Sequence, residues 1–255
     1  MKDTYYTGTE IQAFTLAKAI EKEQIVLVGT GLPLIGSILA KKKFEPSCTL
    51  VVESGLMDFI PQVLPRSISD LRSMAHCSVP CPPYRYLGFQ ANALKYDNNN
   101  VLGFIGGAAV DPYGNVAATC IGDYYRPKTR FTGSGGANAI AAFVHSVIIM
   151  QHEKRRFVEK VNYITSPGWL EGPGSREKCG LPANRGPVMV VSELGVMKFD
   201  SVTKRMYLHG YYPFTSVEEI MDNTGFDMDT SKAIVLPEPD NETVDFLREV
   251  SKSLS

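Results

Sequence analysis

The residue with the clearest chemical potential in this sequence is a glutamate, Glu53, at the end of a short apolar run. Residues 49–52 have the aliphatic and β-branched character of a buried strand, and the small residues Ser54 and Gly55 follow the acid. In open α/β sheets, ligands bind at the carboxyl ends of the strands. A carboxylate there suits a nucleophile or a general base. A structural alternative stays open, in which Glu53 caps a helix or pairs with an arginine.

The elements before Glu53 predict a βαβ unit. Residues 25–28 form an apolar strand that ends in the loop Gly29-Thr30-Gly31, and residues 34–42 have the character of a helix. Two strands joined through a helix pair in parallel with a right-handed crossover. Both strand ends, with the glycine loop and Glu53, should therefore lie at one edge of the sheet.

The whole chain predicts an α/β fold with an open, mostly parallel sheet, flanking helices and antiparallel hairpins. Further helices are expected at 9–23, 67–76, 137–143, 216–223 and 241–253, and further strands at 84–89, 101–110, 116–120, 146–150, 188–191, 196–199 and 205–210. Residues 166–187 are rich in proline and glycine, which predicts a long structured loop. Because no repeat or linker is evident, residues 1–255 are expected to form a single domain.

Two glycine-rich loops precede expected helices, at residues 29–31 and 133–137. Backbone N–H groups at a helix start, helped by the helix dipole, can bind a phosphate or the oxyanion of a tetrahedral intermediate. Alternatively, the glycines only permit tight turns. Neither loop fits the G-x-G-x-x-G fingerprint and no P-loop lysine follows, so NAD and ATP are not predicted as ligands.

Other chemical signals are weaker. The basic run at 151–157 could contact nucleotide phosphates, although charge runs usually form a solvated surface. Cys77 and Cys81, near His76, lack a second ligand pair at zinc-like spacing, so no metal site is predicted. No G-x-S-x-G motif indicates a serine hydrolase.

Composition narrows the function classes further. A net charge of -1 over 255 residues provides no field that would attract nucleic acid or an anionic membrane. The polar N-terminus does not resemble a signal peptide, and no apolar run is long enough to span a bilayer. The 5 scattered cysteines favour free thiols in a reducing cytoplasm.

Six segments of the chain carry a family resemblance. They are 51–58, 104–108, 111–116, 128–138, 151–157 and 165–169. Together they resemble the β subunits of class I CoA-transferases of the glutaconate CoA-transferase type, over nearly the whole chain from about Thr9. Such subunits tend to carry Asn and Ser where this chain has Ala117 and Ala118. That departure leaves the acid substrate open, unless both alanines face the core.

The resemblance implies that Glu53 attacks the thioester of an acyl-CoA such as acetyl-CoA. An acyl-glutamyl anhydride and then a glutamyl-CoA thioester form, and a short dicarboxylic acid of the glutaconate or 2-hydroxyglutarate type takes up the CoA. CoA is therefore a substrate, and no permanently bound cofactor is expected. Backbone groups for the oxyanion and CoA are expected first at Gly135, Gly136 and Ala137, then at Thr30 and Gly31, and also at Gly106 and Gly107.

The resemblance also implies a homologous α subunit in a heterotetramer or heterooctamer, with the active site at the interface between subunits. Two alternatives stay open: an acyl-CoA decarboxylase or ring-opening hydrolase on the same scaffold, and a non-catalytic subunit that binds CoA esters. Glu53 favours transfer, because those decarboxylases and hydrolases do not keep this glutamate and a sensor needs no nucleophile.

Overall fold

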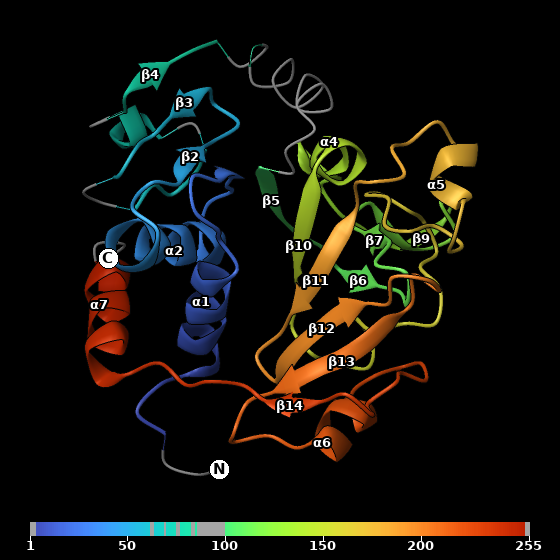
Figure 1. Cartoon of the computed structure of the whole chain (residues 1–255). Helices are drawn as coiled ribbons and strands as arrows, with labels where there is room; N and C mark the ends of the chain where they lie inside the picture. The colour runs from blue at the N-terminus through green and yellow to red at the C-terminus, as the bar shows by residue number, and fades with distance from the viewer. Residues whose placement is uncertain are drawn as a thin grey trace. The chain divides into compact units, whose positions relative to one another are not determined.

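The chain divides into two compact units. The computed structural model describes residues 4–61, 64–68, 70–74, 77–82, 85 and 100–252 (Figure 1). The first unit comprises Met1–Phe104 and Glu238–Ser255, and the second comprises Ile105–Pro237. Each unit combines helices with a mixed sheet, as the sequence predicts. The expectation of a single domain stays a prediction.

The first unit contains the predicted βαβ arrangement. Its strand order is β5-β1-β2-β3-β4, in which β1 pairs in parallel with both β5 and β2, whereas β3 and β4 add antiparallel pairs. The bounds are β1 (Ile25–Leu27), β2 (Thr49–Val51), β3 (Leu56–Met57), β4 (Val79–Pro80) and β5 (Val101–Gly106), which crosses the boundary between the units. Leu27 lies opposite both Val51 and Gly103, so β1 and β2 end together at one edge, whereas β5 continues to Gly106.

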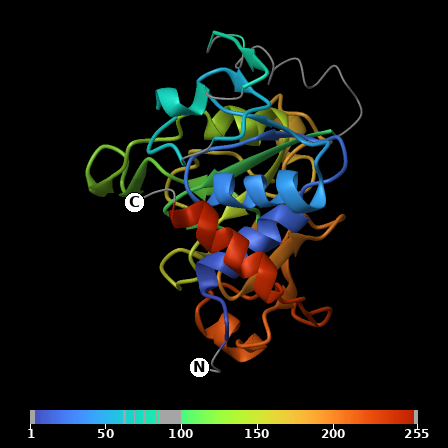
Figure 2. The same ribbon diagram turned by 90° about the vertical axis from the view of Figure 1, so that its left-hand side faces the viewer.

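Helices from both ends of the chain pack together in the first unit (Figure 2). They are α1 (Gly8–Lys18), α2 (Leu32–Leu39) and α7 (Asn241–Lys252), with a π-helical turn η1 (Ala40–Phe44) after α2 and a 3-10 turn η2 (Leu71–Met74). Thr7 and Glu10 form a reciprocal capping box at the start of α1. The helix ends at Lys18, earlier than predicted, because Ile20 donates its N–H to Ala17 in a tight turn.

The second unit has the strand order β14-β13-β12-β11-β10. The predicted hairpins β11–β12 and β12–β13 are confirmed, and β10 pairs with β11 in parallel. The bounds are β10 (His145–Ile149), β11 (Pro187–Val191), β12 (Gly195–Phe199), β13 (Met206–Tyr211) and β14 (Ile234–Val235), with helices α4 (Ala137–Phe143), α5 (Ser175–Lys178) and α6 (Val217–Asp222). Ser216 caps α6 through the N–H of Glu219, as the sequence predicts.

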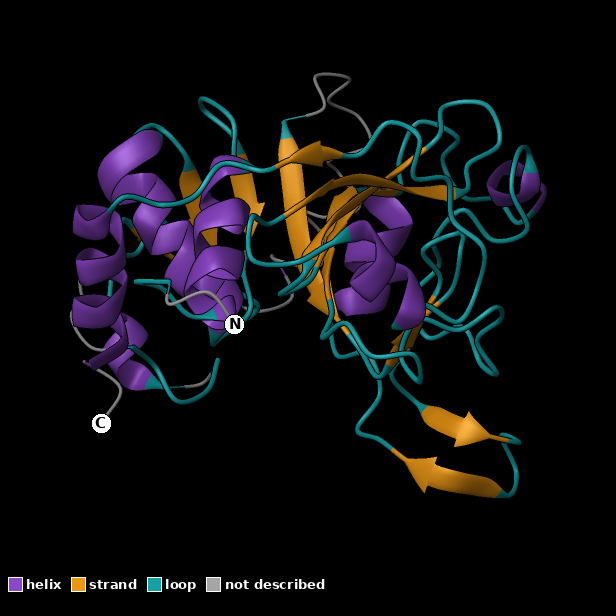
Figure 3. Ribbon diagram, turned by 90° about the horizontal axis from the view of Figure 1, so that it is seen from below, coloured by secondary structure: helices purple, strands orange, loops and turns teal. Residues whose placement is uncertain are grey.

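Two small hairpins complete the second unit. The predicted pair β6 (Ala109–Val110) and β7 (Val116–Ala117) is confirmed, but each strand is shorter than expected. The pair β8 (Cys120–Gly122) and β9 (Pro127–Arg130) was not predicted, and it extends away from the rest of its unit (Figure 3). The sequence of β9 did not predict a strand, because its exposed residues lack the alternation of apolar and polar side chains that is typical of a half-buried strand.

The loop at 166–187 is ordered by buried polar groups. Asn115 accepts the N–H groups of Gly168 and Leu170, and its own amide donates to the carboxylate of Asp111. Arg176 is 1% exposed and donates to five backbone carbonyls, two of them in α4. A fully bonded guanidinium therefore replaces the apolar core that this loop lacks.

Some expectations fall on residues that the structure does not describe. Apart from residue 85, the expected strand at 84–89 lies outside the described residues, as do parts of the expected helix at 67–76. Within the described residues, no helix has the length and apolar character needed to cross a bilayer. All 5 cysteines lie in described positions and are free of disulfide bonds.

A buried histidine holds the start of the basic run at 151–157. The ring of His152 is 3% exposed and stacks on Phe157, and its two nitrogens lie 2.9 Å from Ser192 Oγ and 3.0 Å from Thr224 Oγ1. Burial lowers the pKa of His152 to about 4. In the unfolded chain its pKa is about 6.5, so the fold favours the neutral ring.

This burial predicts a loss of stability in acid. Above about pH 6.5 the contribution is fully present, and it falls as the pH drops towards 4, because the unfolded chain then binds the extra proton. Between pH 7 and 5, His152 should remove about 2 kcal/mol of unfolding free energy. Urea unfolding at pH 7 and at pH 5 measures this loss of unfolding free energy. The loss should be smaller in His152→Gln than in the wild type. An equal loss of unfolding free energy in the variant would contradict the assignment of the pH dependence to His152.

Candidate active site

Glu53 lies in the turn at residues 52–55, between β2 and β3. Val52 accepts the N–H of Gly55 at 2.9 Å and donates its own N–H to Leu56 at 3.1 Å, which closes the hairpin around Glu53 and Ser54. Gly55 has a φ of +92, the left-handed position that such hairpin loops require. Glu53 is half-buried at this turn. The sequence predicted the strand end correctly but missed the reversal, since β3 is only two residues long.

A second chain segment fixes this turn. Cys81 donates its N–H to the carbonyl of Gly55 at 2.9 Å, in line with the antiparallel pairing of β3 and β4. A Cβ atom at residue 55 would lie 1.8 Å from the carbonyl oxygen of Cys81. Only glycine fits, both for its φ and for this close approach. The backbone that carries Glu53 is thus held from two sides.

The glycine loop after β1 lies at the same edge of the first unit as Glu53. Val28 donates its N–H to Val51 at 2.9 Å, so the segments that follow β1 and β2 leave the sheet together. Gly31 has a φ of 77 and precedes α2, and a Cβ at this position would meet no atom within 4 Å. The structure thus brings Thr30 and Gly31 to the edge predicted for them. Their role towards an oxyanion stays a prediction.

A small pocket adjoins the turn of Glu53. Its volume is about 300 Å³, and it is lined by Ser54, Leu56, Ile68, Asp70, Met74, Pro80, Cys81 and Pro82. The Ser54 hydroxyl is buried and has no hydrogen-bond partner among the described residues. A buried hydroxyl without a partner costs free energy, so a ligand or another chain is expected to satisfy it.

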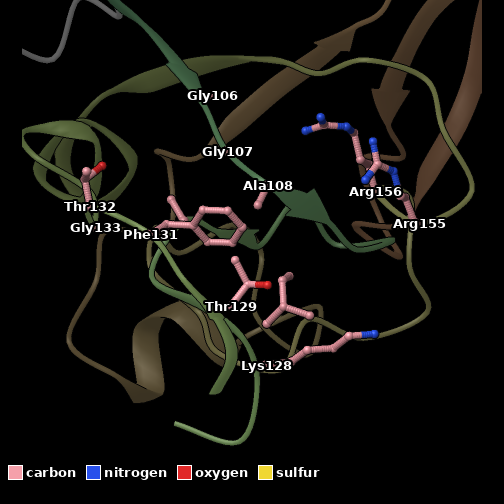
Figure 4. Close-up of a pocket in the computed structure, with 12 residues that line it drawn as sticks. Gly106, Gly107, Ala108, Lys128, Thr129, Phe131, Thr132, Gly133, Arg155 and Arg156 are labelled. Carbon is pink, nitrogen blue, oxygen red and sulfur yellow. The ribbon is translucent and has the colours of Figure 1, made fainter. Parts of the chain in front are cut away.

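A larger pocket of about 750 Å³ lies within the second unit (Figure 4). It is lined by Gly106, Gly107, Ala108, Ala118, Ile121, Lys128, Thr129, Phe131, Thr132, Gly133, Arg155 and Arg156. Gly107 also has a packing role, because a Cβ there would lie 2.3 Å from the side chain of Val116. The two predicted residues Gly106 and Gly107 thus border a cavity large enough for a cofactor-sized ligand.

The two alanines that depart from the family pattern have different surroundings. Ala117 is 1% exposed and belongs to a core cluster with Ala109 and Val161. Ala118 lines the large pocket, and its N–H donates to the hydroxyl of Thr165. Ala117 therefore faces the core. Ala118 instead places a methyl group on the pocket wall, where the family pattern has a polar side chain.

The third predicted group lies at the start of α4 in the second unit. The N–H of Ala137 already donates to the carbonyl of Ser134 at 3.0 Å, which closes a turn. Gly135 is exposed with a φ of 53, and its N–H has no acceptor among the described residues. Gly136 is the residue before the helix. Gly135 is therefore a better candidate donor than Ala137.

The sequence did not place Lys128 in any site. For the basic run that contains Arg155 and Arg156, it left open both a contact with nucleotide phosphates and a solvated surface. These three cations share one pocket, although β9 and the 151–157 segment are far apart in the chain. None of the described residues that line the pocket is acidic. Among the described residues, no group of three or more His, Cys, Asp or Glu could hold a metal ion.

The sequence model of the Coenzyme A transferase family matches residues 9–223. The chain belongs to this family, as its motifs predicted.

Individual relatives refine the comparison. The chain is 55% identical to the B subunit of glutaconate CoA-transferase from Acidaminococcus fermentans, over 96% of this chain and 92% of that protein. The crystal structure of that organism's glutaconate CoA-transferase superposes with a TM-score of 0.94, covering 96% of this chain and 95% of the other. The chain is also 33% identical to the B subunit of 3-oxoadipate CoA-transferase from Pseudomonas knackmussii, over 87% and 84% of the two chains. The decarboxylase AibA/AibB shares the fold, with 23% identity, a TM-score of 0.79 and coverage of 96% and 94%.

Proposed function

We propose that this CoA-transferase chain is the glutamate-bearing subunit of an enzyme that moves CoA between an acyl-CoA and a short dicarboxylic acid. The observation that carries the proposal is the position of Glu53, on a turn fixed by Gly55 and Cys81 at the edge where parallel strands end. Relatives at 55% and 33% identity both transfer CoA to or from dicarboxylic acids, glutaconate in one case and 3-oxoadipate in the other.

The chemistry proceeds through two covalent states of Glu53. Its carboxylate oxygen attacks the thioester carbonyl, the C–S bond breaks, and CoA thiolate leaves behind an acyl-glutamyl anhydride. The thiolate then attacks the glutamyl carbonyl, which releases the free acid and leaves a glutamyl-CoA thioester. A carboxylate of the acceptor acid then attacks the glutamyl-CoA thioester, and CoA thiolate leaves a second anhydride. The thiolate attacks the acceptor's carbonyl in this anhydride, which forms the new acyl-CoA and regenerates Glu53. A carboxylate suits this transfer because the glutamyl-CoA thioester that it forms lies close in energy to the acyl-CoA substrate, so each step is reversible.

Backbone donors stabilise the oxyanion that each attack creates. Gly135 and Gly136 are the first candidates and Thr30 and Gly31 the second, whereas the N–H of Ala137 is engaged by Ser134. Such donors act best where water is excluded, which also protects the anhydride and thioester from hydrolysis. A homologous α subunit in a heterotetramer or heterooctamer would complete and close this site.

The direct test is an assay of the complex co-purified with its partner subunit. Transfer from acetyl-CoA should be measured to glutaconate, 2-hydroxyglutarate, 3-oxoadipate and a monocarboxylic acid as control. Turnover with one or more of the dicarboxylic acids is expected. Release of carbon dioxide, ring opening without an acceptor acid, or CoA binding without turnover would favour the decarboxylase, hydrolase or non-catalytic alternatives instead.

A further inference from the structure

The large pocket of the second unit is lined by three basic side chains. Arg155, Arg156 and Lys128 line it from two different segments, and Figure 4 shows the two arginines on one side and the lysine on another. The described residues of the pocket wall include no carboxylate that could neutralise these cations. Three cations around one cavity favour a ligand with several negative charges.

The arginines are only partly neutralised by their own chain. Arg155 forms a close ion pair with Glu153, and Arg156 Nε lies 3.6 Å from the same carboxylate. One acid thus serves two guanidinium groups. Arg156 Nε is buried and lacks a hydrogen-bond partner among the described residues. Because a buried donor without a partner is costly, an anion in the pocket would satisfy it.

Lys128 faces the same cavity without any acid. The ammonium group has no ion pair with the described residues, and the side chain is exposed on β9. Phe131 also borders the pocket and is 39% exposed. An exposed aromatic ring beside cations is a common arrangement for stacking a nucleobase next to its phosphates.

We infer that Arg155, Arg156 and Lys128 bind the phosphate groups of the nucleotide end of CoA. The inference rests on the proposed function, because it assigns residues to one part of that substrate. The competing ligand is the free carboxylate of the dicarboxylic acid. That carboxylate carries a single negative charge, and the acid has only a few carbon atoms. The pocket has three cations and a volume of about 750 Å³. A nucleotide bearing a diphosphate and a further phosphate fits this charge and size better.

The test uses thioesters that differ only in their phosphates, on the co-purified two-subunit complex. Acetyl-CoA, acetyl-dephospho-CoA and acetyl-pantetheine are compared in wild type, Arg156→Gln, Arg155→Gln and Lys128→Gln. KM for acetyl-CoA should rise about 10- to 100-fold in Arg156→Gln with little change in kcat, since charge-assisted hydrogen bonds to phosphate are lost. KM for acetyl-pantetheine, which has no phosphate, should stay at the wild-type value.

A matched control removes a charge outside the pocket. Lys160→Gln alters an exposed lysine of the same loop and should leave every KM unchanged. Arg155→Gln guards against a folding defect, because its side chain is 76% exposed. An unchanged KM for acetyl-CoA in all three pocket variants would overturn the inference. A rise confined to KM for the dicarboxylic acid would also overturn it and would assign the cations to that acid.

Failure of the proposed function can be told apart from failure of this inference. If the wild-type complex transferred CoA to no acid, calorimetric titration with CoA and dephospho-CoA would still measure binding. Weaker CoA binding in the arginine variants, together with a smaller difference between the two ligands, would support the phosphate site without transfer. Equal CoA affinity in wild type and variants would exclude it.

Discussion

Replacing Glu53 by glutamine should lower kcat for CoA transfer by at least about a thousand-fold in the two-subunit complex. An amide cannot form the anhydride or the thioester, so the covalent route closes and only residual background reaction remains. The substitution preserves the size of the side chain and should leave the turn at Val52 and Gly55 intact. Steady-state rates with saturating acetyl-CoA and acceptor acid measure the effect.

Two controls make this result specific. Glu45→Gln removes a second glutamate outside the turn, at the end of η1, and should leave kcat unchanged. Glu53→Asp retains the carboxylate but shortens its reach by one methylene, so activity between wild type and Glu53→Gln is expected. Full activity in Glu53→Gln would remove this side chain from the chemistry.

The second large effect is expected from Gly55→Ala. The added methyl group would lie 1.8 Å from the carbonyl oxygen of Cys81, so the turn must move or the contact between β3 and β4 must open. The φ of +92 adds about 1 kcal/mol of backbone strain. Because catalysis depends on sub-ångström placement of the nucleophile, kcat should fall about 100-fold.

A matched glycine separates strain from displacement. Gly180 has a φ of +75, but a Cβ there would meet nothing within 4 Å. Gly180→Ala should therefore lose about 1 kcal/mol of stability and keep its activity. Thermal unfolding and kcat are measured for both variants. Equal activity in Gly55→Ala and Gly180→Ala would show that the turn does not position the reacting group.

The parts of the fold that sequence predicts are those with strong local signals. Helix α4 occupies the predicted residues, and the hairpins β11–β12 and β12–β13 follow the aliphatic runs on either side of their turns. Ser216 and Glu219 identify the start of α6 through their spacing. Such signals act over a few residues and do not depend on the rest of the chain.

The elements that the sequence did not predict depend on contacts between distant segments of the chain. Strands β3 and β4 have two residues each, so their pairing is set by tertiary context rather than by periodicity. The same holds for the site. The edge that carries Glu53 follows from a βαβ unit, whereas the pocket of Lys128 and Arg156 requires the unpredicted hairpin β8–β9 to fold beside the 151–157 segment.

Trapping the covalent intermediate tests the central claim most directly. The complex is incubated with acetyl-CoA without an acceptor acid, treated with hydroxylamine and digested with trypsin, which releases residues 44–66 as one peptide. Mass spectrometry should find a hydroxamate on Glu53, only after exposure to acetyl-CoA and absent from Glu53→Gln. An active complex that yields no modified Glu53, or a hydroxamate on another carboxylate, would contradict the account.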